Sequence, residues 1–169
     1  MLWGFSASGD FVTRMAIIYP ERIQCVVAGG IGGFPILPFS SLDGDSLKYP
    51  VGISDFEKLF SKKFNADAFK SIPMKLFQGD CDENDSVSKG DELSNENDFI
   101  SDSYSHSQCR FINKKFGIVP VHRVTKVSSL YSDFGMQNFT YVIAPNVYHE
   151  ITPIQEKALN FFKRNCYGK

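Results

Sequence analysis

A turn of small residues near the start of the chain places the strongest constraint on its local fold. The apolar residues Met1-Leu2-Trp3 precede the turn Gly4-Phe5-Ser6-Ala7-Ser8-Gly9, and a helical pattern follows over residues 11–18. Serine and glycine immediately before an apolar, periodic run are typical of a helix start. The sequence therefore predicts a strand, a sharp turn and a helix in direct succession.

Ser6 is the candidate nucleophile of this turn. A strand-turn-helix of this kind can expose a serine hydroxyl at its tip, as in a nucleophile elbow. The strand and helix then pass so closely that the residues two before and two after the serine must be small, as Gly4 and Ser8 are around Ser6. If Ser8 were the nucleophile, the larger Asp10 would take the second position. The competing interpretation is an ordinary helix N-cap.

Length and composition favour one domain over residues 1–169. The chain has 169 residues, of which 43% are hydrophobic and 22% charged, and its net charge is −1; these values are ordinary for a soluble globular protein. We expect no nucleic-acid partner and no membrane span, because the charge is small and the apolar runs are short. No signal peptide is visible. The scattered cysteines predict free thiols and a cytoplasmic location: Cys25, Cys81, Cys109 and Cys166.

Strand-like and helix-like segments alternate along the chain, which predicts an α/β fold with about four parallel strands flanked by helices. Strands are expected over residues 1–5, 23–28, 74–78 and 139–143. Helices are expected over residues 11–18, 54–60, 66–70, 106–116 and 121–134, and from Pro153 onward. Residues 31–52 should form an irregular excursion, and residues 80–108 an acidic, polar surface loop.

Two carboxylates after the third predicted strand compete for the role of orienting a histidine. Asp82 lies three residues after Gly79, at the strand end. Asp85 begins an Asp-x-Val pattern that often follows such an acid. An acid in this loop could stabilise an imidazolium. The pattern gives Asp85 a slight preference, and the spacing keeps Asp82 open.

A calcium site is the alternative interpretation of the same loop. Asp80-x-Asp82-x-Asn84 imitates the start of an EF-hand. The sixth position, however, is Asp85 rather than glycine, and the twelfth is Asp91 rather than glutamate. A strand precedes the loop where an EF-hand needs a helix, so we expect no metal.

His149 is the candidate general base. It lies between the last predicted strand and the last helix, in a loop that can reach the nucleophile, because the carboxyl ends of parallel strands share one edge of the sheet. His106 and His122 lie in polar, helix-like segments and are interpreted as surface residues. The glycine-rich stretch of residues 29–33 precedes Phe34-Pro35 rather than a helix, so backbone freedom explains it better than phosphate binding.

The order Ser, Asp, His, each after a successive strand, is that of the α/β-hydrolase fold. The chain resembles the C-terminal part of an α/β hydrolase of the esterase and depolymerase-like branch, whose members carry a Gly-Phe-Ser-Ala-Ser-Gly elbow. This resemblance implies Ser6 as nucleophile, Asp85 or Asp82 as acid, His149 as base and the Ala7 amide as an oxyanion donor. It also implies a small ester or acyl substrate, an acyl-enzyme and no cofactor. The segments that carry it are residues 4–9, 19–23, 49–56, 79–87 and 148–153.

The resemblance also implies that the strands that precede the elbow in such hydrolases are missing here. Those strands would carry a second oxyanion donor, whose loss lowers turnover about 100- to 1000-fold. We therefore expect a half-domain with weak activity or none unless it is complemented. The strand from Met1 to Phe5 would expose an edge for self-association or for a complementing N-terminal half. The alternative is a non-catalytic interaction module that retains the triad by descent.

Overall fold

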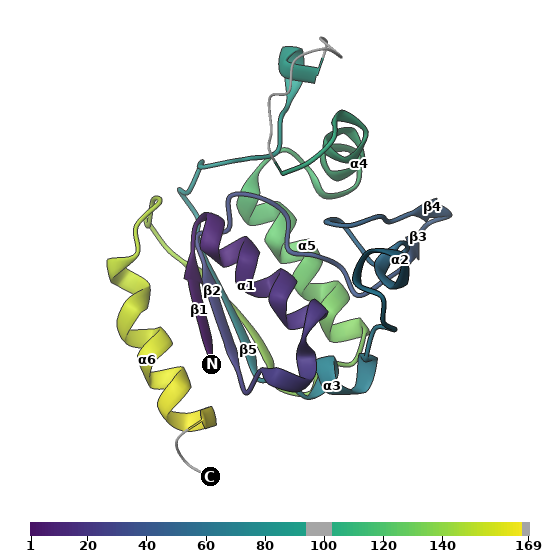
Figure 1. The fold of residues 1–169 in the computed structure, drawn as a ribbon. Coiled ribbons are helices and arrows are strands. Elements are labelled where there is room, and N and C mark those ends of the chain that lie inside the picture. The colour runs from purple at the N-terminus through teal and green to yellow at the C-terminus, as the bar shows by residue number, and fades with distance from the viewer. Residues whose placement is uncertain (94–102, 167–169) are drawn as a thin grey trace.

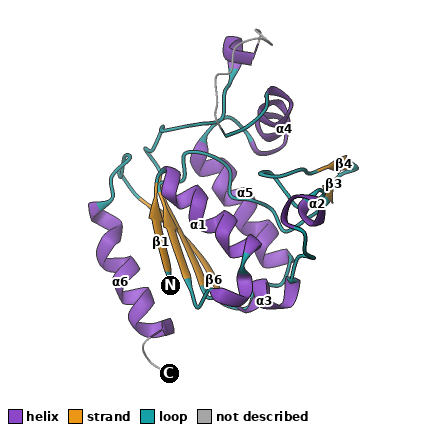
Figure 2. Ribbon diagram, viewed as in Figure 1, coloured by secondary structure: helices purple, strands orange, loops and turns teal. Residues whose placement is uncertain are grey.

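The computed structural model describes residues 1–93 and 103–166, and its centre is a four-stranded parallel sheet. The strand order is β1-β2-β5-β6 (Figures 1 and 2). The four predicted strands are confirmed, with end points shifted by at most a few residues. They are β1 (Leu2–Phe5), β2 (Val26–Gly29), β5 (Met74–Gly79) and β6 (Phe139–Ala144).

The helices cover both faces of this sheet. Figure 1 shows α1 and α5 against one face and α6 against the other. The predicted helices are confirmed. They are α1 (Ala7–Ile18), α2 (Phe56–Phe60), α3 (Ala66–Ser71), α4 (His106–Phe116), α5 (Pro120–Asp133) and α6 (Thr152–Cys166), with short 3-10 turns at η1 (Pro20–Arg22) and η2 (Gly90–Leu93).

The two faces of the sheet carry apolar cores of different size. The face under α1 and α5 belongs to a large core in which Ala28, Leu76 and Val124 are fully buried. The face under α6 is thinner, and its buried members are Val27, Phe77, Ile154 and Ala158. Strand β2 is buried along its whole length because it lies inside the sheet and between the two helical layers.

Two loop predictions need correction. The excursion over residues 31–52 contains a small antiparallel hairpin, β3 (Ser41–Leu42) with β4 (Asp45–Ser46). The polar loop predicted over residues 80–108 ends earlier, because α4 begins at His106 behind a capping box made by Ser105 and Gln108. Residues 94–102 of that loop lie outside the described residues.

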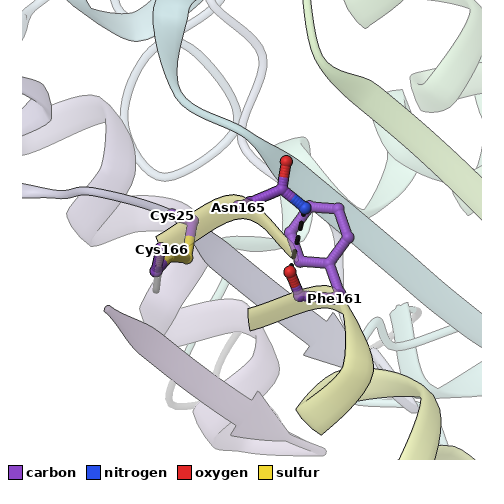
Figure 3. Close-up of a disulfide and its surroundings, with 4 residues drawn as sticks. All are labelled: Cys25, Phe161, Asn165 and Cys166. Atoms are coloured by element: carbon purple, nitrogen blue, oxygen red, sulfur yellow. Dashed lines mark hydrogen bonds between the residues drawn. A yellow bond between two sulfur atoms is a disulfide. The ribbon is translucent and has the colours of Figure 1, made fainter. Parts of the chain in front are cut away.

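The prediction that all four cysteines are free thiols is wrong. Cys25 and Cys166 form a disulfide, although they are 141 residues apart in sequence (Figure 3). Helix α6 runs back along the sheet from the end of β6, so its last turn reaches the residue just before β2. Cys81 and Cys109 are outside this disulfide. The cysteines therefore give no support for a reducing compartment. No described helix is long and apolar enough to cross a membrane.

Candidate active site

The turn at Ser6 has the geometry of a strained elbow. Ser6 joins β1 directly to α1 and has φ 60° and ψ −130°, a conformation that residues with a side chain rarely adopt. A Cβ atom on Gly4 would lie 2.0 Å from the carbonyl oxygen of Ser8. The close passage of strand and helix inferred from the sequence is thus confirmed, and only glycine fits at position 4.

The two serines of the turn have different hydrogen-bond partners. Ser8 Oγ accepts from the Phe5 amide at 2.9 Å and donates to the Phe5 carbonyl at 2.7 Å, so this hydroxyl holds the turn together. Ser6 occupies the N-cap position of α1, yet its side chain makes no capping hydrogen bond. The N-cap interpretation therefore does not account for the hydroxyl of Ser6.

The structure brings Asp82 to His149. The His149 Nδ1 atom lies 3.0 Å from both carboxylate oxygens of Asp82. The Asp82 side chain is fully buried, and the His149 side chain keeps 30% of its surface exposed. Asp82 Oδ1 also accepts from the Asn84 amide at 3.0 Å, and Oδ2 accepts from Gln78 Nε2 at 3.1 Å. The two contacts from Asn84 and Gln78 are ones that an ionised acid accepts, and His149 Nδ1 can donate a third in the tautomer that carries its proton on Nδ1.

Asp85, the slightly preferred acid in the sequence, points elsewhere. Its carboxylate forms an ion pair with Arg123, whose side chain is fully buried, and Lys89 lies 3.7 Å away. The Asp-x-Val pattern has a local explanation, because Asp85 Oδ1 accepts from the Val87 amide at 2.9 Å in an Asx turn. The carboxylate beside His149 is therefore that of Asp82, whereas the carboxylate of Asp85 contacts Arg123, 38 residues away.

His149 lies beside the elbow as well as beside the acid. It belongs to the loop between β6 and α6, and its ring packs on Phe5 with 4.8 Å between ring centroids. Phe5 directly precedes Ser6. When Nδ1 donates its proton to Asp82, Nε2 is left as an acceptor. His106, at the start of α4, is half-buried and His122, on α5, is exposed, which agrees with their interpretation as surface residues.

The first turn of α1 offers an amide suited to a developing oxyanion. Ala7 is the first residue of α1, and amides in the first turn of a helix have no intrahelical acceptor. The glycine-rich stretch after β2 is less available. The Gly30 amide donates to the Phe77 carbonyl at 3.1 Å, and the Ile31 amide donates to Gln78 Oε1 at 3.0 Å.

The acidic loop does not have the form of a metal centre. Among residues 1–93 and 103–166, no group of three or more His, Cys, Asp or Glu side chains could hold a metal ion. Asp82 would have been the central ligand of the EF-hand-like stretch, but it is occupied by His149, Gln78 and Asn84.

Two residues that matter for this geometry had no role in the sequence interpretation. Gln78 contacts the acid, and Arg123 takes the competing carboxylate. The sequence holds a signal for Gln78, since it is a polar residue in the otherwise apolar strand end Leu76-Phe77-Gln78. Arg123 lies on α5 among ordinary helix residues and gives no such signal.

Comparison with known proteins supports the fold. No family model and no curated protein sequence matches the chain. The solved structure of poly(aspartic acid) hydrolase-1 from Sphingomonas sp. KT-1 superposes on 94% of this chain with a TM-score of 0.60 and 18% identity. Poly(3-hydroxybutyrate) depolymerase from Bordetella parapertussis covers 99% of this chain and 50% of its own, with a TM-score of 0.49 and 17% identity.

The chain spans about half the length of the poly(aspartic acid) hydrolase, since 52% of that protein is covered. At 18% identity the likeness shows the fold alone. That fold is a four-stranded parallel sheet flanked by helices, which corresponds to about half of an α/β-hydrolase fold. The fold class expected from the sequence is thereby confirmed.

Proposed function

We propose that this chain carries the catalytic triad of a serine hydrolase that cleaves esters or related acyl compounds. Ser6 is the nucleophile, His149 the general base and Asp82 the acid that orients it. The observation that carries this proposal is the 3.0 Å contact of His149 Nδ1 with Asp82, made by a ring that packs on the residue preceding Ser6.

The proposed reaction begins at the imidazole. Asp82 accepts the Nδ1 proton and keeps His149 in the tautomer whose Nε2 can take a proton. His149 removes the proton of Ser6 as Oγ attacks the acyl carbon. The Ala7 amide, at the positive end of the α1 dipole, donates to the oxyanion. His149 then protonates the leaving alcohol, and water hydrolyses the acyl-enzyme by the reverse proton path.

One donor at the oxyanion leaves the proposed site weak. Ala7 supplies one amide, and the amides of Gly30 and Ile31 already donate elsewhere. A missing donor costs about 100- to 1000-fold in turnover. We therefore expect slow ester hydrolysis by this chain and faster hydrolysis when a second segment supplies another donor. A non-catalytic interaction module with the same residues is the alternative, and the outer edge of β1, which pairs with no other strand in the described part of the chain, favours it.

A fluorophosphonate probe tests the proposal, because it reacts with activated serines and not with ordinary ones. We expect labelling of Ser6, identified by mass spectrometry of the labelled peptide. Ser6→Ala should abolish it. Ser8→Ala is the matched control within the same turn, and it should retain part of the labelling. An unlabelled wild-type chain, or label on Ser8, would support the interaction module instead.

A further inference from the structure

Gln78 is a buried polar side chain with both ends in use. It lies in β5 next to Gly79, the last residue of the strand, and is fully buried. Its Nε2 donates to Asp82 Oδ2 at 3.1 Å, and its Oε1 accepts from the Ile31 amide at 3.0 Å. A backbone amide can only donate and an ionised carboxylate can only accept, so these two partners fix which end of the amide faces which.

This side chain connects the loops at the carboxyl edge of the sheet. Ile31 belongs to the glycine-rich stretch after β2, Asp82 to the loop after β5, and Asp82 contacts His149 from the loop after β6. The carbonyl oxygen of Gly29, at the end of β2, accepts a hydrogen bond from the Ser6 amide at 3.0 Å. Gln78 therefore connects the segments after β2 and β5, Asp82 continues this connection to the loop after β6, and a separate backbone hydrogen bond links the end of β1 to the end of β2.

The Asp82 carboxylate is held symmetrically for His149. The Asn84 amide donates to Oδ1 and Gln78 donates to Oδ2, while His149 Nδ1 lies 3.0 Å from each oxygen. Without the donor from Gln78, Oδ2 would keep only the histidine as a partner. The buried carboxylate could then rotate and carry the imidazole with it.

We propose that Gln78 is a positioning residue, which sets the plane of the Asp82 carboxylate and through it the orientation of His149. This inference rests on the proposed function of Ser6, Asp82 and His149. A side chain that satisfied buried groups and did nothing more would affect stability, whereas a positioning residue affects turnover and the His149–Asp82 hydrogen bond.

The chain contains a matched control for this distinction. Gln108 also bridges two loops, since its Oε1 accepts from the Ser105 amide and its Nε2 donates to the Tyr49 carbonyl, each at 3.0 Å. It contacts neither Asp82 nor His149 in these hydrogen bonds. Replacement by methionine keeps the length of either side chain and removes both of its hydrogen bonds.

The experiment compares Gln78→Met and Gln108→Met in the full chain. Three quantities are measured: the melting temperature, kcat and KM for a p-nitrophenyl ester, and the low-field proton resonance of the His149 Nδ1–H. Gln78→Met should lower kcat about 100-fold with KM nearly unchanged, because a small misplacement at a site costs about that much. It should also remove the low-field resonance. Gln108→Met should change neither kcat nor the low-field resonance.

Gln78→Glu keeps the proposal testable if the methionine variant fails to fold. A carboxylic acid at this position can donate to Asp82 while it is protonated, but two ionised carboxylates cannot share such a contact. We therefore expect the low-field resonance of the Gln78→Glu variant to be present at low pH and to disappear as pH rises. It should disappear at pH values at which the wild-type resonance is still present. A resonance that follows the wild-type one at every pH would overturn the proposal.

The outcomes also separate this inference from the proposed function. If the wild type hydrolyses no ester but its low-field resonance is lost in Gln78→Met, the positioning role stands and the proposed chemistry fails. If the wild type is active and Gln78→Met retains its kcat and the resonance, the chemistry stands and the positioning role fails. Equal losses of kcat in Gln78→Met and Gln108→Met would show a role in stability alone.

Discussion

His149 and Asp82 are 67 residues apart in sequence, yet the Nδ1 atom of the histidine lies 3.0 Å from both oxygens of the carboxylate. The contact joins the loop after β6 to the loop after the neighbouring strand β5. Parallel strands present their carboxyl ends at one edge of the sheet, so such loops meet without any local sequence signal. Asp82 is fully buried in this contact, and its other hydrogen bonds come from Gln78 and the Asn84 amide.

Asp82→Asn should lower ester hydrolysis far more than Asp85→Asn does. An asparagine at position 82 favours the wrong imidazole tautomer, and such a change costs about 10⁴-fold in kcat. Asp85 contacts Arg123 instead of the histidine, so its replacement should leave the tautomer unchanged. Steady-state kinetics of both variants under conditions where each is folded provides the measurement. The opposite ranking would return the role of the acid to Asp85.

Asp85→Asn should destabilise the fold. The exchange leaves the guanidinium of Arg123, a fully buried side chain, without its charged partner. Removing one member of a buried ion pair costs about 3–5 kcal/mol in the free energy of unfolding. The double variant Asp85→Asn with Arg123→Met should recover most of this loss, as urea denaturation can measure. If the losses of unfolding free energy from the two exchanges were additive in the double variant, the ion pair between Asp85 and Arg123 would be contradicted.

Gly4→Ala should disrupt the elbow. The added Cβ would lie 2.0 Å from the Ser8 carbonyl oxygen, which is backbone and cannot move without parting β1 from α1. We expect loss of fluorophosphonate labelling at Ser6 together with a lower melting temperature. Gly90→Ala is the comparison without a steric clash, because no atom lies within 4 Å of its added Cβ, although its positive φ adds a backbone cost that Gly4 does not have. It should leave the labelling intact.

Asp10 should make stability fall as pH rises through weakly acidic values. Burial raises the pKa of Asp10 from 3.8 to about 6, although Arg14 acts in the opposite direction. The folded state therefore holds this proton more tightly than the unfolded chain. Its stabilising contribution is complete below the unfolded pKa and is lost as pH passes the folded one. At about 1.4 kcal/mol per pKa unit, the loss amounts to about 3 kcal/mol.

Asp10→Asn removes this dependence. The difference in unfolding free energy between the variant and the wild type should grow by about 2 kcal/mol in favour of the variant between pH 4 and pH 7, because a small part of the total is already lost at pH 4. Urea denaturation at several pH values measures it. Asp67→Asn, on an exposed face of α3, is the control and should show no comparable growth. If the difference in unfolding free energy between Asp10→Asn and the wild type stayed constant with pH, the raised pKa of Asp10 would be contradicted.

Reduction of the Cys25–Cys166 disulfide should destabilise the chain. The bridge closes a loop over a separation of 141 residues and attaches the last turn of α6 to the residue before β2. Only Ile154 and Ala158 of α6 are buried, so the apolar anchor of this helix is small. Cys166→Ser should cost about 2–4 kcal/mol of unfolding free energy. Cys81→Ser is the control, and four free thiols in the unreduced, unfolded protein would disprove the bridge.

The outer edge of β1 should promote self-association. Within residues 1–93 and 103–166, β1 pairs with β2 on one side and lies at the end of the sheet on the other. An unpaired strand edge is a template for pairing with another chain, and a lysine on such an edge opposes it. Trp3→Lys should therefore lower the apparent mass measured by light scattering at high concentration, and its melting temperature is measured in parallel because Trp3 also packs on the apolar group under α6. Phe11→Lys, which replaces an exposed aromatic on α1, should not.

Much of the fold could be predicted from the sequence because its signals are local. Apolar runs ended by Gly79 or by the turn at Ser6 mark strand ends, and the 3.6-residue period marks the helices. The elbow could also be predicted, since the constraint on Gly4 arises from residues four positions away. The hairpin β3–β4 was missed, because strands of two residues carry too short a pattern.

The sequence alone thus determined the parallel α/β sheet, the position of Ser6 at a strained turn and the loops that hold an acid and a histidine. The tertiary structure decided which acid meets His149, that Arg123 takes Asp85, that Gln78 joins the strand ends, and that Cys25 bonds to Cys166. The physical reason is the same in each case. Local periodicity sets the elements, but a contact between residues tens of positions apart depends on the path of the chain in space.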